Sequence, residues 1–283
     1  MWRNRGIGRE GKACAKPKAS MKAVELAYKG FRFAVPVETE AFWPYYGILF
    51  VGEYDPLLKS LRRGDIVLDA GANIGIFTLL ASRIAELVIA VEPDPENFSY
   101  LKYNIELNRA KNVLPIRKAL SNYHGTGYIS GKGLSAHLSL RGSGHAVEVT
   151  TVDKLLKDLG LSARGVDAMK MDIEGSEIHA LDGDYLENLR VLMLETHGRR
   201  TLEHVRSILL KKGFSLAVWR FSYTITILRI LKGVKDFIRA ECSTGFAASR
   251  AVISYIASGF KKHPVPASTI EGGYSLIYAW RES

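Results

Sequence analysis

VLDAGANIG, residues 67–75 of this 283-residue chain, places an apolar run directly before a glycine-containing turn. The apolar run predicts a buried β-strand that brings Asp69 to its carboxyl end. The stretch IGIFTLLASRIA follows at once and predicts a helix. Gly71 and Gly75 remove side chains where a ligand and the next helix approach, and Asn73 tolerates a turn conformation. Strand, turn and helix in this order favour a ligand-binding α/β sheet over a tight turn without a ligand.

Strand and helix patterns continue to alternate on the C-terminal side of this turn. The strand patterns are residues 87–92, 112–120, 168–173, 190–196, 214–220 and 274–280, and the helical patterns are residues 97–108, 152–160, 175–183 and 201–213. Residues 121–150 are rich in Gly, Ser and His, which predicts loops and a short meander. The alternation predicts a doubly wound, mostly parallel sheet with helices on both faces.

The N-terminal part of the chain differs from this alternating domain, which we assign to residues 64–283. Residues 1–20 are basic and Gly-rich, lack the apolar stretch of a secretory signal, and are expected to be disordered. Residues 21–63 contain AVELAY and FRFAVPV, two strand patterns around the dipeptide Lys29-Gly30, and then the aromatic stretch FWPYYGILF. We expect a β-hairpin and an aromatic appendage that pack on the main domain.

An insertion at about residues 221–273 separates the last two strand patterns. Apolar residues recur at helical spacing within residues 221–262, with basic residues on the opposite face. We favour packing on the sheet or a homodimer interface for these amphipathic helices. Peripheral contact with a membrane surface is the alternative.

Composition limits the partners and the compartment. The formal net charge of +10 favours anionic partners without choosing among them. Cys14 and Cys242 are far apart, and neither a disulfide framework nor a metal site is indicated. We therefore expect a cytoplasmic protein without a structural metal, either free or peripheral to a membrane.

A second motif, VIAVEPDPENF, places Glu92 at the end of the next strand, about 20 residues beyond the turn. A carboxylate there can accept hydrogen bonds from both ribose hydroxyls of a nucleoside. The turn lacks the GxGxxG spacing of a dinucleotide-binding loop and the lysine of a phosphate-binding loop. The ribose of NAD could nevertheless form the same hydrogen bonds with Glu92.

Two further strand ends carry ionisable side chains. MKMDIEGSE alternates Lys170, Asp172 and Glu174, and LETHG alternates Glu195 and His197. The carboxylates could deprotonate or orient a hydroxyl, and a histidine titrates near neutral pH. The structural alternatives are an ion pair between Lys170 and Glu174, a helix cap at Glu174, and a hydrogen-bonding role for His197.

Together these motifs resemble the FkbM family of S-adenosylmethionine-dependent methyltransferases. The matching strings are EYDPLLKSLRRGDIVLDAGANIGIFTLLAS, VEPDPENFSYLKYNIELN, VDKLLKDL, MKMDIEGSEIHALDG and LMLETH, within residues 23–213. The resemblance implies a class I, Rossmann-like methyltransferase sheet of seven strands whose last hairpin is antiparallel. The insertion after Arg220 has no counterpart in the resemblance.

The resemblance also implies roles for single residues. The cofactor would be S-adenosylmethionine. Its methionine part would be wrapped by the turn that contains Asp69, Ala70, Gly71, Ala72, Asn73 and Gly75, and its ribose would be held by Glu92 beside Pro93. Its adenine would be flanked by Ala119 and Leu120, and Glu53 and Tyr54 would close over it. The methyl-transfer end would be lined by Lys170, Asp172, Glu174, Glu195 and His197, and Asp172 would also bind the cofactor.

The activity that the resemblance implies is O-methylation of a hydroxyl, on a sugar of a glycan or glycolipid or on a small molecule. Asp172, Glu174 and His197 all remain candidates for the base. The sequence MDIEG argues against methylation of DNA amino groups, and nucleic acid is not expected as a partner. The alternatives are an RNA methyltransferase, favoured only by the net charge, and a cofactor-binding scaffold without catalysis.

Overall fold

The computed structural model describes residues 23–36, 47–130, 137–139, 144–162, 165–196, 198–220 and 275–281. The expected disordered tail (residues 1–20), the expected helical insertion (residues 221–273) and His197 lie outside these described residues.

The main sheet has the order β12-β13-β11-β10-β3-β4-β5. Its strands are β3 (Ile66–Ala70), β4 (Leu87–Val91), β5 (Val113–Ile116), β10 (Ala168–Met171), β11 (Val191–Thr196), β12 (Ser215–Arg220) and β13 (Ser275–Trp280). Strands β11, β10, β3, β4 and β5 are parallel, whereas β13 is antiparallel to both β11 and β12. The predicted α/β class with a parallel core is confirmed.

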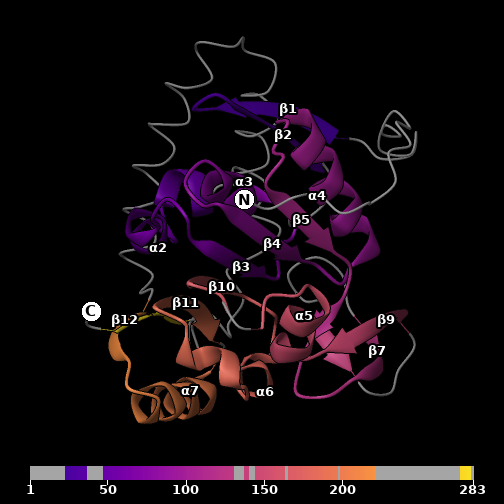
Figure 1. Ribbon diagram of the computed structural model, residues 1–283. Helices are drawn as coiled ribbons and strands as arrows, with labels where there is room; N and C mark the ends of the chain where they lie inside the picture. The colour runs from indigo at the N-terminus through magenta and orange to yellow at the C-terminus, as the bar shows by residue number, and fades with distance from the viewer. Residues whose placement is uncertain are drawn as a thin grey trace, which may run out of the picture.

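Helices cover both faces of this sheet (Figure 1). One face carries α2 (Asp55–Ser60), α3 (Ile76–Ser82) and α4 (Pro95–Leu107), and the other carries α5 (Val152–Asp158), α6 (Glu177–Ala180), a 3-10 turn (Asp184–Glu187) and α7 (Arg199–Lys211). The helix predicted at residues 175–183 is wrong in length, because α6 is a single turn, Glu177–Ala180. None of the helices in the described ranges has the length and apolar character of a membrane span.

The third predicted strand, residues 112–120, is wrong in its extent. The chain leaves the main sheet after Ile116, and Ala119–Leu120 forms β6, which pairs with β9 in a second sheet. This small sheet has the order β6-β9-β7-β8 and contains β7 (Gly125–Ser130), β8 (His137–Ser139) and β9 (His145–Thr150). The expected meander is therefore wrong in topology, because β9 returns beside β7 and not beside β8. The small sheet extends one side of the cleft described below.

The N-terminal hairpin is present as predicted. Strands β1 (Ala23–Tyr28) and β2 (Phe31–Pro36) are antiparallel, and both turn residues have positive φ, +46° at Lys29 and +79° at Gly30. This two-residue geometry matches the right-handed twist of a hairpin. Phe33 is fully buried in the same apolar cluster as Phe77 of α3, so the hairpin shares the core of the sheet, as does the π-helical turn Gly47–Val51.

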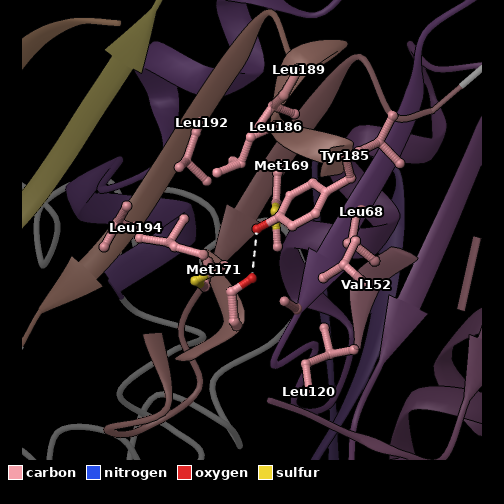
Figure 2. Packing of buried hydrophobic residues seen from close by; sticks show 14 of the residues in the cluster. Leu68, Leu120, Val152, Met169, Met171, Tyr185, Leu186, Leu189, Leu192 and Leu194 are labelled. Atoms are coloured by element: carbon pink, nitrogen blue, oxygen red, sulfur yellow. Dashed lines mark hydrogen bonds between the residues drawn. The ribbon is translucent and has the colours of Figure 1, made fainter. Parts of the chain in front are cut away.

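The opposite face is filled by an apolar cluster around Tyr185 (Figure 2). The ring of Tyr185 lies near Met169 of β10 and Leu186. The Tyr185 hydroxyl donates a hydrogen bond of 2.9 Å to the carbonyl oxygen of Ala180. Burial raises the pKa of Tyr185 far above its usual range. The phenol therefore stays protonated and links α6 to the 3-10 turn.

The turn after β3 approaches the chain after β10 very closely. A Cβ atom on Gly71, whose φ is +76°, would lie 1.8 Å from the carbonyl oxygen of Asp172. Because Gly71 also has a left-handed backbone, both its conformation and its surroundings require glycine.

We predict that Gly71→Ala is far more destabilising than Gly160→Ala. Gly160 has a similar φ of +71°, but a Cβ there would meet nothing within 4 Å. Gly160→Ala should cost about 1 kcal/mol from backbone strain alone. Gly71→Ala should cost about 3 kcal/mol or more, because the backbone must also move. Urea unfolding measures both values, and equal losses would contradict the close approach.

Candidate active site

A cleft lies where the strand order of the main sheet reverses, at the carboxyl ends of β3 and β10. Such switch points are where open α/β sheets bind ligands. The cleft is open to solvent. The lining residues come from the π-helical turn, the strand ends and loops at β3, β4, β5 and β10, the first turns of α3 and α4, and the small sheet. They are Ile48, Gly71, Ala72, Asn73, Ile76, Phe77, Val91, Glu92, Pro93, Asp94, Asn97, Lys118, Ala119, Leu120, Ile129, Leu138, Lys170, Asp172, Ile173, Glu174 and Ser176.

The glycine-containing turn is held against the end of β4. The backbone N–H groups of Gly71 and Ala72 both donate to the carbonyl oxygen of Val91, at 2.9 Å. Asn73 has a φ of +51°, and its N–H donates to Oε2 of Glu92 at 2.8 Å. The turn and the second motif therefore form one hydrogen-bonded unit.

Glu92 is the acidic residue at the base of this unit. Its Oε1 accepts a hydrogen bond from the N–H of Asp94 at 2.9 Å. Burial raises the pKa of Glu92 to about 7, although the two backbone hydrogen bonds and Lys170 oppose that shift. Each carboxylate oxygen has a second lone pair, so Glu92 can still accept hydrogen bonds from a ligand in the cleft.

Lys170 joins the two strand ends through a buried charge cluster. Its Nζ lies 3.5 Å from Oδ1 of Asp69 and 3.6 Å from Oδ2 of Asp172, and it donates to the carbonyl oxygen of Gly71 at 2.5 Å. Burial alone would lower the pKa of Lys170, but Asp69 and the neighbouring carboxylates raise it above its usual value. The ammonium therefore stays charged and fixes the position of Asp172.

Tyr54, from the segment before β3, covers this cluster. The Nζ of Lys170 lies 5.6 Å from the centre of the Tyr54 ring, within the range of a cation–π contact. Burial, followed by the charges of Asp172, Glu195 and Glu53, raises the pKa of Tyr54 well above its usual value. Glu53 and Glu195 thus lie close enough to influence the cluster, although neither lines the cleft.

The loop after β10 presents the carboxylates. β10 ends at Met171, and Glu174 has a φ of +50°, so the expected alternation along a strand through Glu174 is wrong. Asp172 and Glu174 both line the cleft nevertheless. Oδ1 of Asp172 is buried without a hydrogen-bond partner in the described part of the chain, so it is available to a donor on a ligand.

The structure thus brings together most of the residues expected at the site. The expected residues that line the cleft are Gly71, Ala72, Asn73, Glu92, Pro93, Ala119, Leu120, Lys170, Asp172 and Glu174. Asp69 and Ala70 are completely buried and do not line it; the Thr78 hydroxyl donates to Asp69 at 2.5 Å. Gly75 caps α3 behind the cleft.

Part of the apolar lining of the cleft could not be predicted from the sequence. Ile129 and Leu138 come from the small sheet, and Ile48 comes from the segment before β3. No local motif marks these residues. Ile129 and Leu138 reach the cleft only because the small sheet folds against it. Asp94 and Asn97 were also missed, although both lie inside the EPDPENF motif.

The cleft suits a nucleoside that also carries a charged amino acid. Glu92 can accept from ribose hydroxyls, Ala119 and Leu120 offer an apolar wall, and Asp172 has an acceptor atom for an ammonium group. No group of three or more His, Cys, Asp or Glu residues that could hold a metal ion occurs in the described ranges.

The fold and this cleft define a class I α/β methyltransferase. Residues 69–216 match the model of the methyltransferase FkbM domain, more than half of the chain. The chain belongs to the FkbM methyltransferase family, and its cofactor is S-adenosylmethionine.

Individual relatives are more distant. Methyltransferase sdnD of Sordaria araneosa is 27% identical over 199 residues, which cover 56% of this chain and 77% of the relative. The tRNA (guanine(37)-N(1))-methyltransferase Trm5b of Pyrococcus abyssi is 36% identical over 72 residues, 25% of this chain and 22% of the relative. This chain therefore matches about a fifth of the length of that tRNA methyltransferase. The solved FkbM methyltransferase of Methylobacillus flagellatus is 18% identical with a TM-score of 0.44, over 58% of this chain and 42% of that one.

We predict that affinity for S-adenosylhomocysteine rises with pH through the pKa of Glu92. Ionised Glu92 is the better acceptor for ribose hydroxyls, and its pKa is about 7. The dissociation constant should fall about tenfold from pH 6 to pH 8 and then level off. Calorimetry of Glu92→Gln should give a weaker, pH-independent affinity. A pH-independent wild type would contradict this role.

The same shift predicts how stability depends on pH. The folded protein holds a proton on Glu92 up to about pH 7, whereas the ordinary value is 4.5. Its contribution to the free energy of unfolding should therefore decrease as the pH rises from about 4.5 to 7. This part of the decrease should be absent in Glu92→Gln when urea unfolding is compared across that range.

Proposed function

We propose that this chain transfers the methyl group of S-adenosylmethionine to a hydroxyl oxygen of a sugar, in a glycan or glycolipid. The observation that carries the proposal is the acidic lining after β10, where Asp172 and Glu174 face the same cleft as the cofactor-binding turn. Carboxylates accept hydrogen bonds from sugar hydroxyls and can take up the proton that a hydroxyl loses.

The residues of the chain divide this work between them. When bound, S-adenosylmethionine supplies an electrophilic methyl group on a sulfonium. Glu92 and the glycine-containing turn orient the cofactor, and the acidic loop aligns the acceptor oxygen, which is the main requirement of an in-line displacement. Asp172 is held beside the ammonium of Lys170 and orients a hydroxyl. We assign the base to Glu174, because a non-glycine residue with positive φ at a cleft is typical of functional positions.

RNA is the second candidate substrate. The sequence argued against a nucleic-acid partner, but several relatives are named as tRNA-modifying enzymes, and the chain has a formal net charge of +10. Phosphate contacts would make such binding weaken steeply with salt. Methyl incorporation into tRNA, but not into glycans, would replace the sugar proposal with this one.

We predict that Asp172→Asn and Glu174→Gln each lower the rate of methyl transfer to the accepted glycan by about 100-fold. S-adenosylhomocysteine should bind Glu174→Gln within about threefold of wild type, because the cofactor turn is intact. Asp172→Asn should also bind it more weakly, because Oδ1 of Asp172 is available to the ammonium group of the ligand. Glu203→Gln, on the exposed face of α7, is the control and should be fully active. Radiolabelled methyl transfer to a glycan panel provides the measurement. Full activity of both cleft variants would refute the assigned roles.

A further inference from the structure

Two asparagines of α4 bind the outer edge of hairpin strand β2. The N–H of Arg32 donates to Oδ1 of Asn108 at 2.9 Å, and Nδ2 of Asn108 donates to the carbonyl oxygen of Arg32 at 2.6 Å. Asn104 binds Ala34 in the same way: the N–H of Ala34 donates to Oδ1 of Asn104 at 2.7 Å, and Nδ2 of Asn104 donates to the carbonyl oxygen of Ala34 at 3.2 Å. A side-chain amide carries the same donor and acceptor as a peptide group. The two asparagines, one helical turn apart, therefore take the place of a neighbouring strand.

Asn104 makes one contact that Asn108 does not. Its Nδ2 also donates to the carbonyl oxygen of Ile74 at 2.8 Å, and the side chain is completely buried. Ile74 belongs to the glycine-containing turn, so one amide connects the hairpin, α4 and the cofactor site. Leu101, on the previous turn of α4, contacts the same turn: a Cβ on Gly75 would lie 2.7 Å from its Cδ1.

The position of the Ile74 carbonyl matters because the turn is conformationally demanding. Asn73 on one side has a φ of +51° and Gly75 on the other has a φ of +91°. The N–H of Asn73 is also the donor to Glu92. If the Asn104 amide is lost, the Ile74 carbonyl and the Ala34 backbone groups lose buried partners, and the turn can relax away from Glu92.

We propose that Asn104 is a positioning residue of the cofactor site, through which docking of the N-terminal hairpin sets the turn that holds S-adenosylmethionine. Residues 23–36 are then part of the binding machinery, although none of them lines the cleft. The proposal depends on the cofactor and not on the methyl acceptor, so it stands or falls separately from sugar methylation.

The test compares Asn104→Ala with Asn108→Ala in calorimetric titrations with S-adenosylhomocysteine. Both variants lose the two hydrogen bonds to the hairpin, and both should have a lower melting temperature. Only Asn104→Ala should bind the ligand weakly, with a dissociation constant at least about tenfold higher, whereas Asn108→Ala should stay within about twofold of wild type. Wild-type affinity in Asn104→Ala, or equal weakening in both variants, would overturn the proposal.

If Asn104→Ala does not fold, hydrogen exchange of the wild type tests whether the hairpin is coupled to the cofactor site. Because coupling between two sites is reciprocal, saturation with S-adenosylhomocysteine should slow hydrogen exchange at the amides of Arg32 and Ala34. Amides of α7, such as that of Val205, report the general stabilisation that any ligand provides. The hairpin amides should be slowed at least about fivefold more than those of α7. Equal slowing would contradict the coupling.

Discussion

The ammonium of Lys170, buried between the carboxylates of Asp69 and Asp172, connects the two halves of the sheet at the point where the strand order reverses. Burying a lone charge there would be strongly unfavourable, so the three groups depend on one another. Because Lys170 also donates to the carbonyl oxygen of Gly71, the charge cluster fixes the distance between the turn after β3 and the loop after β10. These are two walls of the cleft, and we propose that they hold the cofactor and the acceptor.

The remaining parts of the molecule support that junction from two sides. Tyr54 covers the cluster from the N-terminal segment, and its phenol stays protonated among the carboxylates. Asn104 ties the glycine-containing turn to the hairpin and to α4. The hairpin therefore has a physical connection to the site, although it lies outside residues 69–216, which match the family model.

The elements that sequence could predict were those with a local signal. The turn at residues 69–75 and the acid at Glu92 were predicted correctly in place, because a glycine pattern and a strand end mark them. Asp69 was expected to wrap the cofactor, but its full burial could not be seen from sequence, since it depends on pairing with Lys170, about a hundred residues away. The predicted extent of β10 is wrong for a related reason. Alternating charges are typical of a strand, but β10 ends at Met171, and the next residue, Asp172, packs its carbonyl oxygen against Gly71, which has no side chain. Ile129 and Leu138 carry no motif and enter the cleft only through the folding of the small sheet.

The central claim is that the cleft at the switch point binds S-adenosylmethionine and not another nucleotide. The most direct test is a calorimetric titration of the purified chain with S-adenosylhomocysteine, with NAD as the competing ligand. The account predicts binding of one molecule of S-adenosylhomocysteine per chain and no heat from NAD. Binding of NAD, or no binding of either ligand, would contradict it.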